Sequence, residues 1–170
     1  MSGMRRGLWS WLVILAASNV WRFAAVQSPQ LDDGQYAVEV AELNGNSQTG
    51  RSIKIAIRAF GNADNDPVLL LHGTPMPSPA MIRLAELLDD HYYVLVPDLP
   101  GFGRSTLSLQ DYSSITHGHY ARELLDALAI PAAHVIGYSQ GGAPAIVLAS
   151  EYPERVTSLT LLAAIGVQEL

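Results

Sequence analysis

Residues 36–60 carry the hydrophobic pattern of a β-hairpin. Isoleucines occupy every second position of one stretch, Ile53, Ile55 and Ile57, and alternate with Lys54, Ala56 and Arg58. This period is typical of a strand that turns one face to the core and the other to solvent. Turn-forming residues from 44 to 50 precede it. The pattern predicts two antiparallel strands at one edge of a sheet.

The following residues alternate between short apolar runs and stretches with helical spacing. The continuous apolar runs cover 68–71, 92–96, 133–136 and 156–164, and each is typical of a strand buried on both faces. Stretches with helical character lie between them, at 81–88, 115–128 and 143–150. Strands that alternate with helices predict an α/β fold, with a mostly parallel sheet and helices on both of its faces.

One turn between such a strand and helix has a composition that suggests chemistry. The segment Gly137-Tyr138-Ser139-Gln140-Gly141-Gly142 joins the run 133–136 to the Ala-rich stretch 143–150. A very tight turn would expose the Ser139 hydroxyl, and it needs small residues two positions before and after the serine, which Gly137 and Gly141 supply. The alternative interpretation is an ordinary Gly-rich turn.

Two further segments, together with this turn, make residues 36–170 resemble the α/β-hydrolase superfamily. They are Leu71-His72-Gly73-Thr74-Pro75 and the loop from Pro97 to Ser105, and the three segments follow the order and spacing of that superfamily. The resemblance implies an α/β-hydrolase fold truncated after about its sixth strand. It divides the chain into residues 1–30, outside the catalytic fold, and residues 31–170, the N-terminal part of the hydrolase domain.

The resemblance also implies a set of site residues. Ser139 would be the nucleophile, and the backbone N–H groups of Thr74 and Gln140 would form the oxyanion hole. Gly137 and Gly141 would support the turn, and His72 and Gly73 the neighbouring loop. We interpret His72 as a structural histidine that holds its loop by hydrogen bonds. Asp98 could be a catalytic carboxylate, but we favour a structural role in which it accepts N–H groups of its own loop.

The residues that should activate Ser139 are missing after it. Members of this superfamily place an Asp or Glu and then a His downstream of the nucleophile. The only acids after Ser139 are Glu151, Glu154 and Glu169, and no His follows. Glu169 is a candidate acid by position, whereas the two other glutamates fall at the wrong end of the sheet.

Two histidines precede the serine near the start of a predicted helix. They are His117 and His119, and we interpret both as solvated side chains at the rim of the site, with proton transfer as the alternative. The sequence therefore predicts a hydrolase portion with nucleophile and oxyanion hole but without a base.

The N-terminus resembles a targeting segment. Arg5 and Arg6 precede the apolar run 8–17, which small residues follow. This order is typical of an export signal, and the run is well short of the ~20 residues that cross a bilayer. An uncleaved membrane anchor and an N-terminal helix packed on the domain are the alternatives. We expect an exported or membrane-attached protein, with a cytoplasmic one as the alternative.

Charge and composition narrow the classes of partner. The net charge is −6, and residues 1–30 hold three arginines and no acid, so the remainder carries −9 (−6 minus +3). An acidic body without a Lys/Arg cluster argues against nucleic acid. The chain has no cysteine, which excludes disulfides and thiolate chemistry. The expected reaction needs no metal or organic cofactor. The sequence carries no signal for an oligomeric state.

The function that we predict is hydrolysis of a small-molecule carboxylic ester, or a related acyl bond, through an acyl-enzyme on Ser139. Amide, lactone or carbon–carbon cleavage would use the same fold, because fold does not fix chemistry. A serine at this position argues against the dehalogenases and epoxide hydrolases of the superfamily. Two alternatives stay open: acyl transfer to an alcohol or thiol, and a non-catalytic fragment or binding module.

Overall fold

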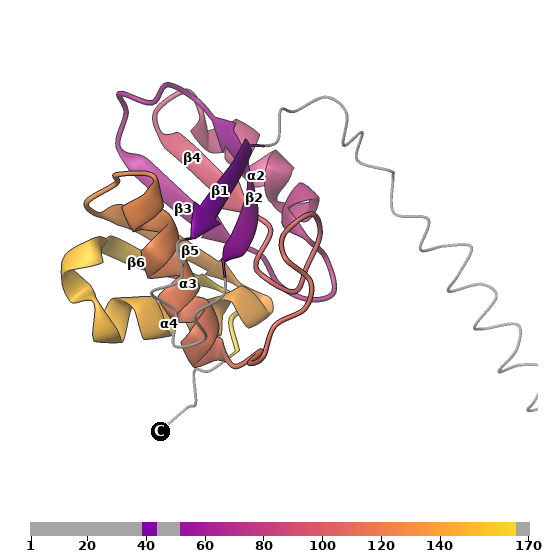
Figure 1. Cartoon of the computed structure of the whole chain (residues 1–170). Helices are drawn as coiled ribbons and strands as arrows, with labels where there is room; N and C mark the ends of the chain where they lie inside the picture. Colours follow the sequence, from indigo (N-terminus) through magenta and orange to yellow (C-terminus); the bar gives the residue numbers. More distant parts are fainter. Residues whose placement is uncertain (1–38, 44–51, 166–170) are drawn as a thin grey trace, which may run out of the picture. The chain divides into compact units, whose positions relative to one another are not determined.

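The structure of the protein is a computed structural model that describes residues 39–43 and 52–165 (Figure 1). The predicted N-terminal targeting segment, the predicted hairpin turn at 44–50, and Glu169 lie outside these ranges. The described residues form an α/β fold around one mixed sheet of six strands. None of their helices is long and apolar enough to cross a membrane.

The sheet is mostly parallel, as the sequence predicts. Its strand order is β1-β2-β4-β3-β5-β6. The bounds are β1 Glu39–Leu43, β2 Ile53–Phe60, β3 Pro67–Leu71, β4 Tyr93–Pro97, β5 Ala133–Tyr138 and β6 Val156–Leu162. β1 pairs antiparallel with β2, and β2 with β4, whereas β4, β3, β5 and β6 run parallel to one another. The antiparallel strands therefore lie at one edge and the parallel strands form the rest.

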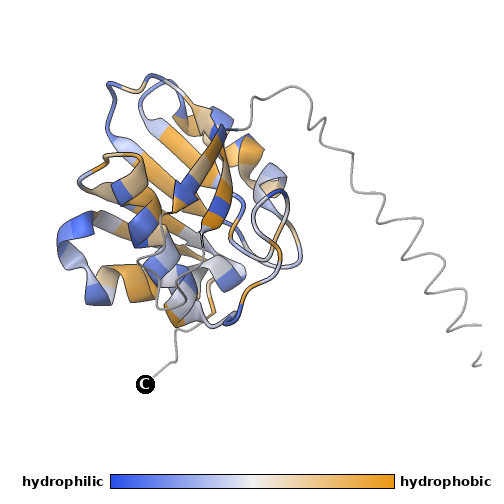
Figure 2. Ribbon diagram, viewed as in Figure 1, coloured by the Kyte–Doolittle hydropathy of each residue, from blue (hydrophilic) through white to orange (hydrophobic). Residues whose placement is uncertain are grey.

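Helices cover both faces of this sheet. On one face, α3 (Ser114–Ala127) lies beside α4 (Gly142–Glu151), and the other face carries η1 (Ser78–Met81) and α2 (Ile82–Leu88). Two further 3₁₀ turns, η2 (Ser139–Gly141) and η3 (Pro153–Arg155), flank α4. Within β3, Leu69 and Leu71 pack in the core under α3 and α4, while Val68 and Leu70 pack under α2. Figure 2 shows hydrophobic residues concentrated in the strands between these helices.

The face of β2 that carries Lys54, Ala56 and Arg58 is more buried than the alternating pattern predicts. Lys54 is exposed, but Ala56 and Arg58 are 0% and 1% exposed. Arg58 is covered because Ser78 and Asp98, which come from other parts of the chain, contact its guanidinium. The prediction of one solvent-facing side was therefore wrong for these two residues.

β6 is not the buried strand that its apolar run predicts. Most of its side chains are exposed, and Leu159 and Leu162 are each 37% exposed. The physical reason is its position at the edge of the described sheet, where it pairs with β5 on one side only. An apolar run indicates that a strand can be buried, but it does not indicate which elements pack against it.

Candidate active site

Three loops meet at one edge of the sheet. His72 follows β3, Asp98 follows β4, and Ser139 follows β5. Since these three strands are parallel and adjacent, their carboxyl ends lie together, which is where open α/β sheets bind ligands. The three segments that the sequence singles out therefore converge on one site.

Ser139 occupies the tight turn between β5 and α4. Its φ is +50°, in the left-handed region that residues other than glycine rarely adopt. The turn closes so tightly that a Cβ on Gly137 would lie 2.7 Å from the Gly141 carbonyl oxygen. A Cβ on Gly141 would lie 2.3 Å from the Leu71 carbonyl oxygen, so the start of the helix packs directly on the end of β3. A side chain at either position would therefore collide with backbone, so the turn requires both glycines.

The loop after β3 lies against the serine. A Cβ on Gly73 would lie 2.8 Å from Ser139 Cβ and 3.3 Å from Ser139 Oγ. The next residue, Thr74, donates a hydrogen bond from Oγ1 to Gln140 Oε1. The two residues that the sequence nominates as oxyanion donors are thus joined by their side chains, next to the serine.

His72 is a buried histidine that connects two loops. Its Nε2 accepts a hydrogen bond from Leu99 N–H at 2.9 Å, so the ring proton is on Nδ1, which lies 2.9 Å from the Gly73 carbonyl oxygen. Burial lowers the pKa of His72 below its usual value, which favours the neutral ring. Both ring nitrogens are therefore used in holding backbone, and neither is available to accept a proton from Ser139.

Asp98 satisfies backbone donors around its loop. Its Oδ1 accepts from Ser78 N–H at 2.8 Å and its Oδ2 from Arg104 N–H at 3.0 Å, while Arg58 Nη1 lies 3.7 Å from Oδ2. A Cβ on Gly103 would lie 2.3 Å from this carboxylate. These contacts agree with the structural interpretation of Asp98.

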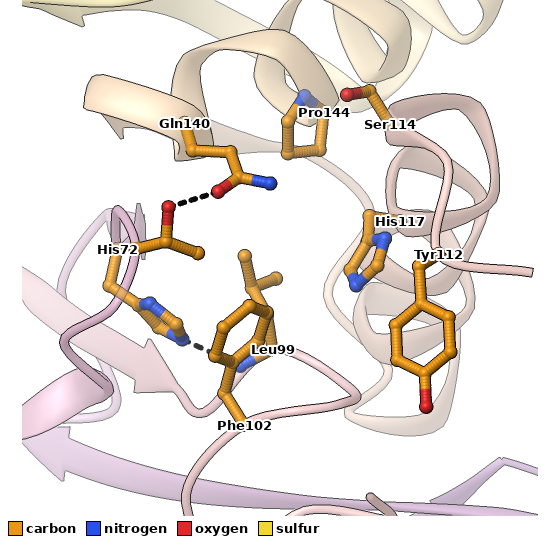
Figure 3. A pocket seen from close by; sticks show the side chains of 9 residues that line it. His72, Leu99, Phe102, Tyr112, Ser114, His117, Gln140 and Pro144 are labelled. Carbon is orange, nitrogen blue, oxygen red and sulfur yellow. Dashed lines mark hydrogen bonds between the residues drawn. The ribbon is translucent and has the colours of Figure 1, made fainter. Parts of the chain in front are cut away.

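A pocket opens beside Thr74 and Gln140 (Figure 3). Its cavity volume is about 20 Å³, and the space reaches about 280 Å³ only when its opening to solvent is counted. Its lining residues come from all three loops, from α3 and from α4: His72, Thr74, Leu99, Phe102, Tyr112, Ser114, His117, Gln140 and Pro144. Figure 3 shows His72 and His117 on opposite sides, with Leu99 and Phe102 between them. Apolar side chains thus form much of the wall beside the proposed donors.

The two rim histidines differ from each other. His117 is buried, and the prediction that it is solvated was wrong, because its Nδ1 lies 2.9 Å from the Ser113 carbonyl oxygen and its Nε2 2.8 Å from that of Pro100. Both nitrogens therefore face carbonyl acceptors. His119 is partly exposed, but its Nε2 pairs with Glu151 at 2.7 Å, so its predicted place at the rim of the site was wrong. Glu151 ends α4, roughly 15 Å along the helix from its start beside Ser139.

Sequence reasoning missed several residues of this region. Arg58 and Ser78 are buried next to the site, and Phe102, Tyr112 and Pro144 line its pocket. Arg58 carried a usable signal, since a charged residue in a strand beside isoleucines is either solvated or paired with an opposite charge. The pocket-lining side chains carried none, because their convergence depends on how distant loops pack.

Comparison with known proteins agrees with this architecture. The profile of a family described as alpha/beta hydrolase fold matches residues 66–169. Lipase 1 of Psychrobacter immobilis is 37% identical over 115 residues, which are 66% of this chain and 36% of the lipase. The acetyltransferase component of an acetoin cleaving system from Cupriavidus necator is 30% identical over 165 residues, which are 91% of this chain and 44% of that protein.

Among solved structures, a bacterial membrane phospholipase A superposes with a TM-score of 0.72 and 28% sequence identity. The superposition covers 96% of this chain and 53% of the phospholipase. The chain spans 36% of the length of the lipase and 44% of that of the acetyltransferase component, so it matches only part of these relatives. The match over residues 66–169, with the mostly parallel sheet, places this chain in the alpha/beta hydrolase fold family.

Proposed function

We propose that this chain carries the nucleophile and the oxyanion hole of a serine hydrolase that acts on carboxylic esters. The observation that carries the proposal is the geometry at Ser139. The serine is held at φ +50° at the carboxyl edge of the parallel strands, with Gly73 in contact and Thr74 bonded to Gln140 beside it. A strained serine in a turn of this kind is the arrangement that presents a hydroxyl to substrate.

The chemistry assigned to these residues is acyl transfer to the serine. Ser139 Oγ attacks the acyl carbon, a base removes the hydroxyl proton, and the carbonyl oxygen becomes an oxyanion. The N–H groups of Thr74 and Gln140 donate to that oxyanion, and the N-terminal end of the helical segment after Ser139 adds its positive dipole. The alcohol then leaves with a proton, and water hydrolyses the acyl-enzyme.

The base that this reaction needs is assigned outside the described residues. His72 and His117 use both ring nitrogens for backbone contacts, and His119 pairs with Glu151 at the far end of α4. His91 lies just before β4 and His134 at the start of β5, at the end of the sheet opposite Ser139. We infer that the acid and histidine of the complete hydrolase belong to a portion of the protein beyond these residues. We therefore propose the full activity for a protein that contains this acid and histidine.

The proposed substrate is a small-molecule ester with an apolar acyl or alcohol part. Leu99, Phe102 and Pro144 give the pocket an apolar wall next to the oxyanion donors, which suits such a group. The names of the matched lipase and phospholipase A also favour an ester substrate. Amide, lactone and carbon–carbon bonds would be tested as alternative substrates on the same serine.

Acyl transfer is a second candidate, and the similarity to an acetyltransferase component favours it. In that case an alcohol or thiol, and not water, would attack the acyl-enzyme. Product analysis in the presence of an added acceptor alcohol separates the two. A transferase forms mainly the new ester even when water is in large excess, whereas a hydrolase forms mainly the free acid.

Export or membrane attachment through the N-terminus is a further part of the proposal. It is supported by Arg5, Arg6 and the apolar run 8–17. Expression with the native N-terminus should yield a protein that has lost about the first 18 residues or that sediments with membranes. A soluble cytoplasmic protein whose intact mass begins at Met1 would refute this.

The decisive experiment for catalysis is Ser139→Ala in the product of the complete reading frame. Hydrolysis of p-nitrophenyl esters should fall to background, while circular dichroism and thermal unfolding stay close to those of the parent. Equal turnover by the variant and the parent would reject Ser139 as the nucleophile. Absence of serine-dependent turnover in the parent would favour the non-catalytic alternative.

A further inference from the structure

The loop that carries Thr74 is held at both ends by one short segment after β4. At one end, His72 Nε2 accepts from Leu99 N–H at 2.9 Å. At the other end, Ser78 N–H donates to Asp98 Oδ1 at 2.8 Å. Residues 73–77 lie between these two bonds, and they include Gly73, where an added Cβ would lie 2.8 Å from Ser139 Cβ.

Arg58 completes this arrangement from β2. Its Nη1 donates to Ser78 Oγ and lies 3.7 Å from Asp98 Oδ2, so it contacts both the loop end and the carboxylate that binds it. Asp98 Oδ2 also accepts from Arg104 N–H at 3.0 Å. Arg58 and Asp98 are each 1% exposed and Ser78 is 0% exposed. The ion pair is therefore fully withdrawn from water.

We propose that the Arg58–Asp98 ion pair is a positioning device that sets the place of the Thr74 backbone N–H relative to Ser139. This inference rests on the proposed function. Arg58 and Asp98 do not contact the substrate pocket; they act through Ser78, Leu99 and His72 on the loop between them.

The choice of charged residues here supports a positioning role. A buried ion pair is weak evidence for stability, since well-packed apolar residues of similar volume often stabilise a core equally well. What the pair supplies is direction, because each carboxylate oxygen accepts one specified backbone N–H group. Oxyanion donors act only when they are fixed in advance at the correct place, so rigidity at this loop has a chemical use.

The test is Asp98→Asn in the product of the complete reading frame. An Asn side chain of the same shape presents an NH₂ group to one of the two backbone N–H donors, so one hydrogen bond is replaced by a repulsive contact. We expect kcat for p-nitrophenyl butyrate to fall about 100-fold, the effect of misplacing a reacting group by about 1 Å, with KM little changed. Arg58→Gln should lower kcat in the same way, and Arg58→Lys should restore part of it.

A stability-matched control separates positioning from general weakening. Leu125→Ala removes a fully buried side chain of α3, an element that supplies none of the hydrogen bonds of this arrangement, and it should lower the melting temperature with little change in kcat. If Asp98→Asn does not fold, Arg58→Gln carries the same comparison. A folded Asp98→Asn variant whose kcat is within threefold of that of Leu125→Ala would overturn the proposal.

Nitrogen NMR of the His72 ring gives a readout that does not depend on turnover. The parent should show His72 protonated on Nδ1, with Nε2 as the acceptor of Leu99 N–H. Asp98→Asn should shift this ring toward a mixture of tautomers, whereas Leu125→Ala should not. An unchanged His72 signal in Asp98→Asn would overturn the positioning role. Absence of serine-dependent turnover in the parent would instead reject the proposed function, and the His72 signal would still decide the positioning role.

Discussion

Gly73→Ala is the substitution that most directly tests the contact between the Thr74 loop and Ser139. The added Cβ would lie 2.8 Å from Ser139 Cβ, 3.1 Å from the Tyr138 carbonyl oxygen and 3.3 Å from Ser139 Oγ. Carbon atoms in contact sit about 3.5–4.0 Å apart, so the loop and the serine must separate by about 0.7–1.2 Å. Backbone forms one side of this contact, and it cannot rotate away as a flexible side chain can.

A displacement of this size should affect catalysis more than folding. Overpacking by one methyl group costs about 1–3 kcal/mol of stability, which a folded domain can tolerate. A misplacement of about 1 Å between a reacting atom and its donors can cost about 100-fold in rate. We therefore expect kcat for p-nitrophenyl butyrate to fall about 100-fold in the complete protein, while the variant remains folded.

Gly61→Ala is the matched control. Gly61 has φ +78°, and a Cβ there would lie 2.2 Å from the Tyr92 carbonyl oxygen, so the steric conflict is at least as severe. It follows β2 at the end of the sheet opposite Ser139. This variant should lose stability and keep its kcat. If Gly73→Ala keeps a kcat within about threefold of the parent, the loop does not supply a donor at this distance.

Three further predictions follow from other contacts. Thr74→Val removes the hydroxyl that binds Gln140 Oε1, and it should lower kcat/KM by up to about tenfold, which corresponds to a hydrogen bond of about 0.5–1.5 kcal/mol. Thr74→Ser keeps the hydroxyl and should retain most of the activity. Equal kcat/KM for the two variants in steady-state kinetics would contradict a role for this hydrogen bond. Burial raises the pKa of Glu123 above its usual value of 4.5, because the charged carboxylate is disfavoured in the fold. The stability of the fold should therefore decrease as pH rises and Glu123 ionises. Glu123→Gln should therefore unfold at a higher temperature than the parent at pH 7, and the gain should shrink as pH falls toward 4.5; a constant or reversed difference across this range would contradict the assignment. Residues 1–170 alone should show only trace turnover of activated esters, because an unassisted serine hydroxyl is a weak nucleophile; turnover near that of ordinary esterases, absent in Ser139→Ala, would place a base within these residues.

The sequence predicted the parts of the fold that local pattern determines. The apolar run at 68–71 indicated a strand buried on both faces, and β3 is such a strand. The glycines around Ser139 indicated a tight turn, and both are in close contact with neighbouring backbone. In each case the structure depends on the same residues that form the sequence pattern, so the prediction did not require knowledge of a distant contact.

Features that depend on distant partners were not predicted. His117 is polar and sits near a helix start, so exposure was the natural expectation, yet the Pro100 carbonyl oxygen covers it from a loop 17 positions earlier. Arg58 follows an alternating pattern that indicates solvent, and its burial results from Asp98, which lies on another strand's loop. β6 shows the opposite case. Its apolar residues predicted a buried strand, but the described elements do not cover its side chains.

Under the proposed function, the positive φ of Ser139 sets the stability of the fold and the reaction against each other at a single residue. A left-handed backbone costs a serine about 1–3 kcal/mol, whereas glycine adopts it freely. Selection for thermostability alone would therefore drive position 139 toward glycine, and a library screened only for folding should enrich that replacement. Persistence of serine in active variants would then measure how strongly the reaction itself constrains the gene.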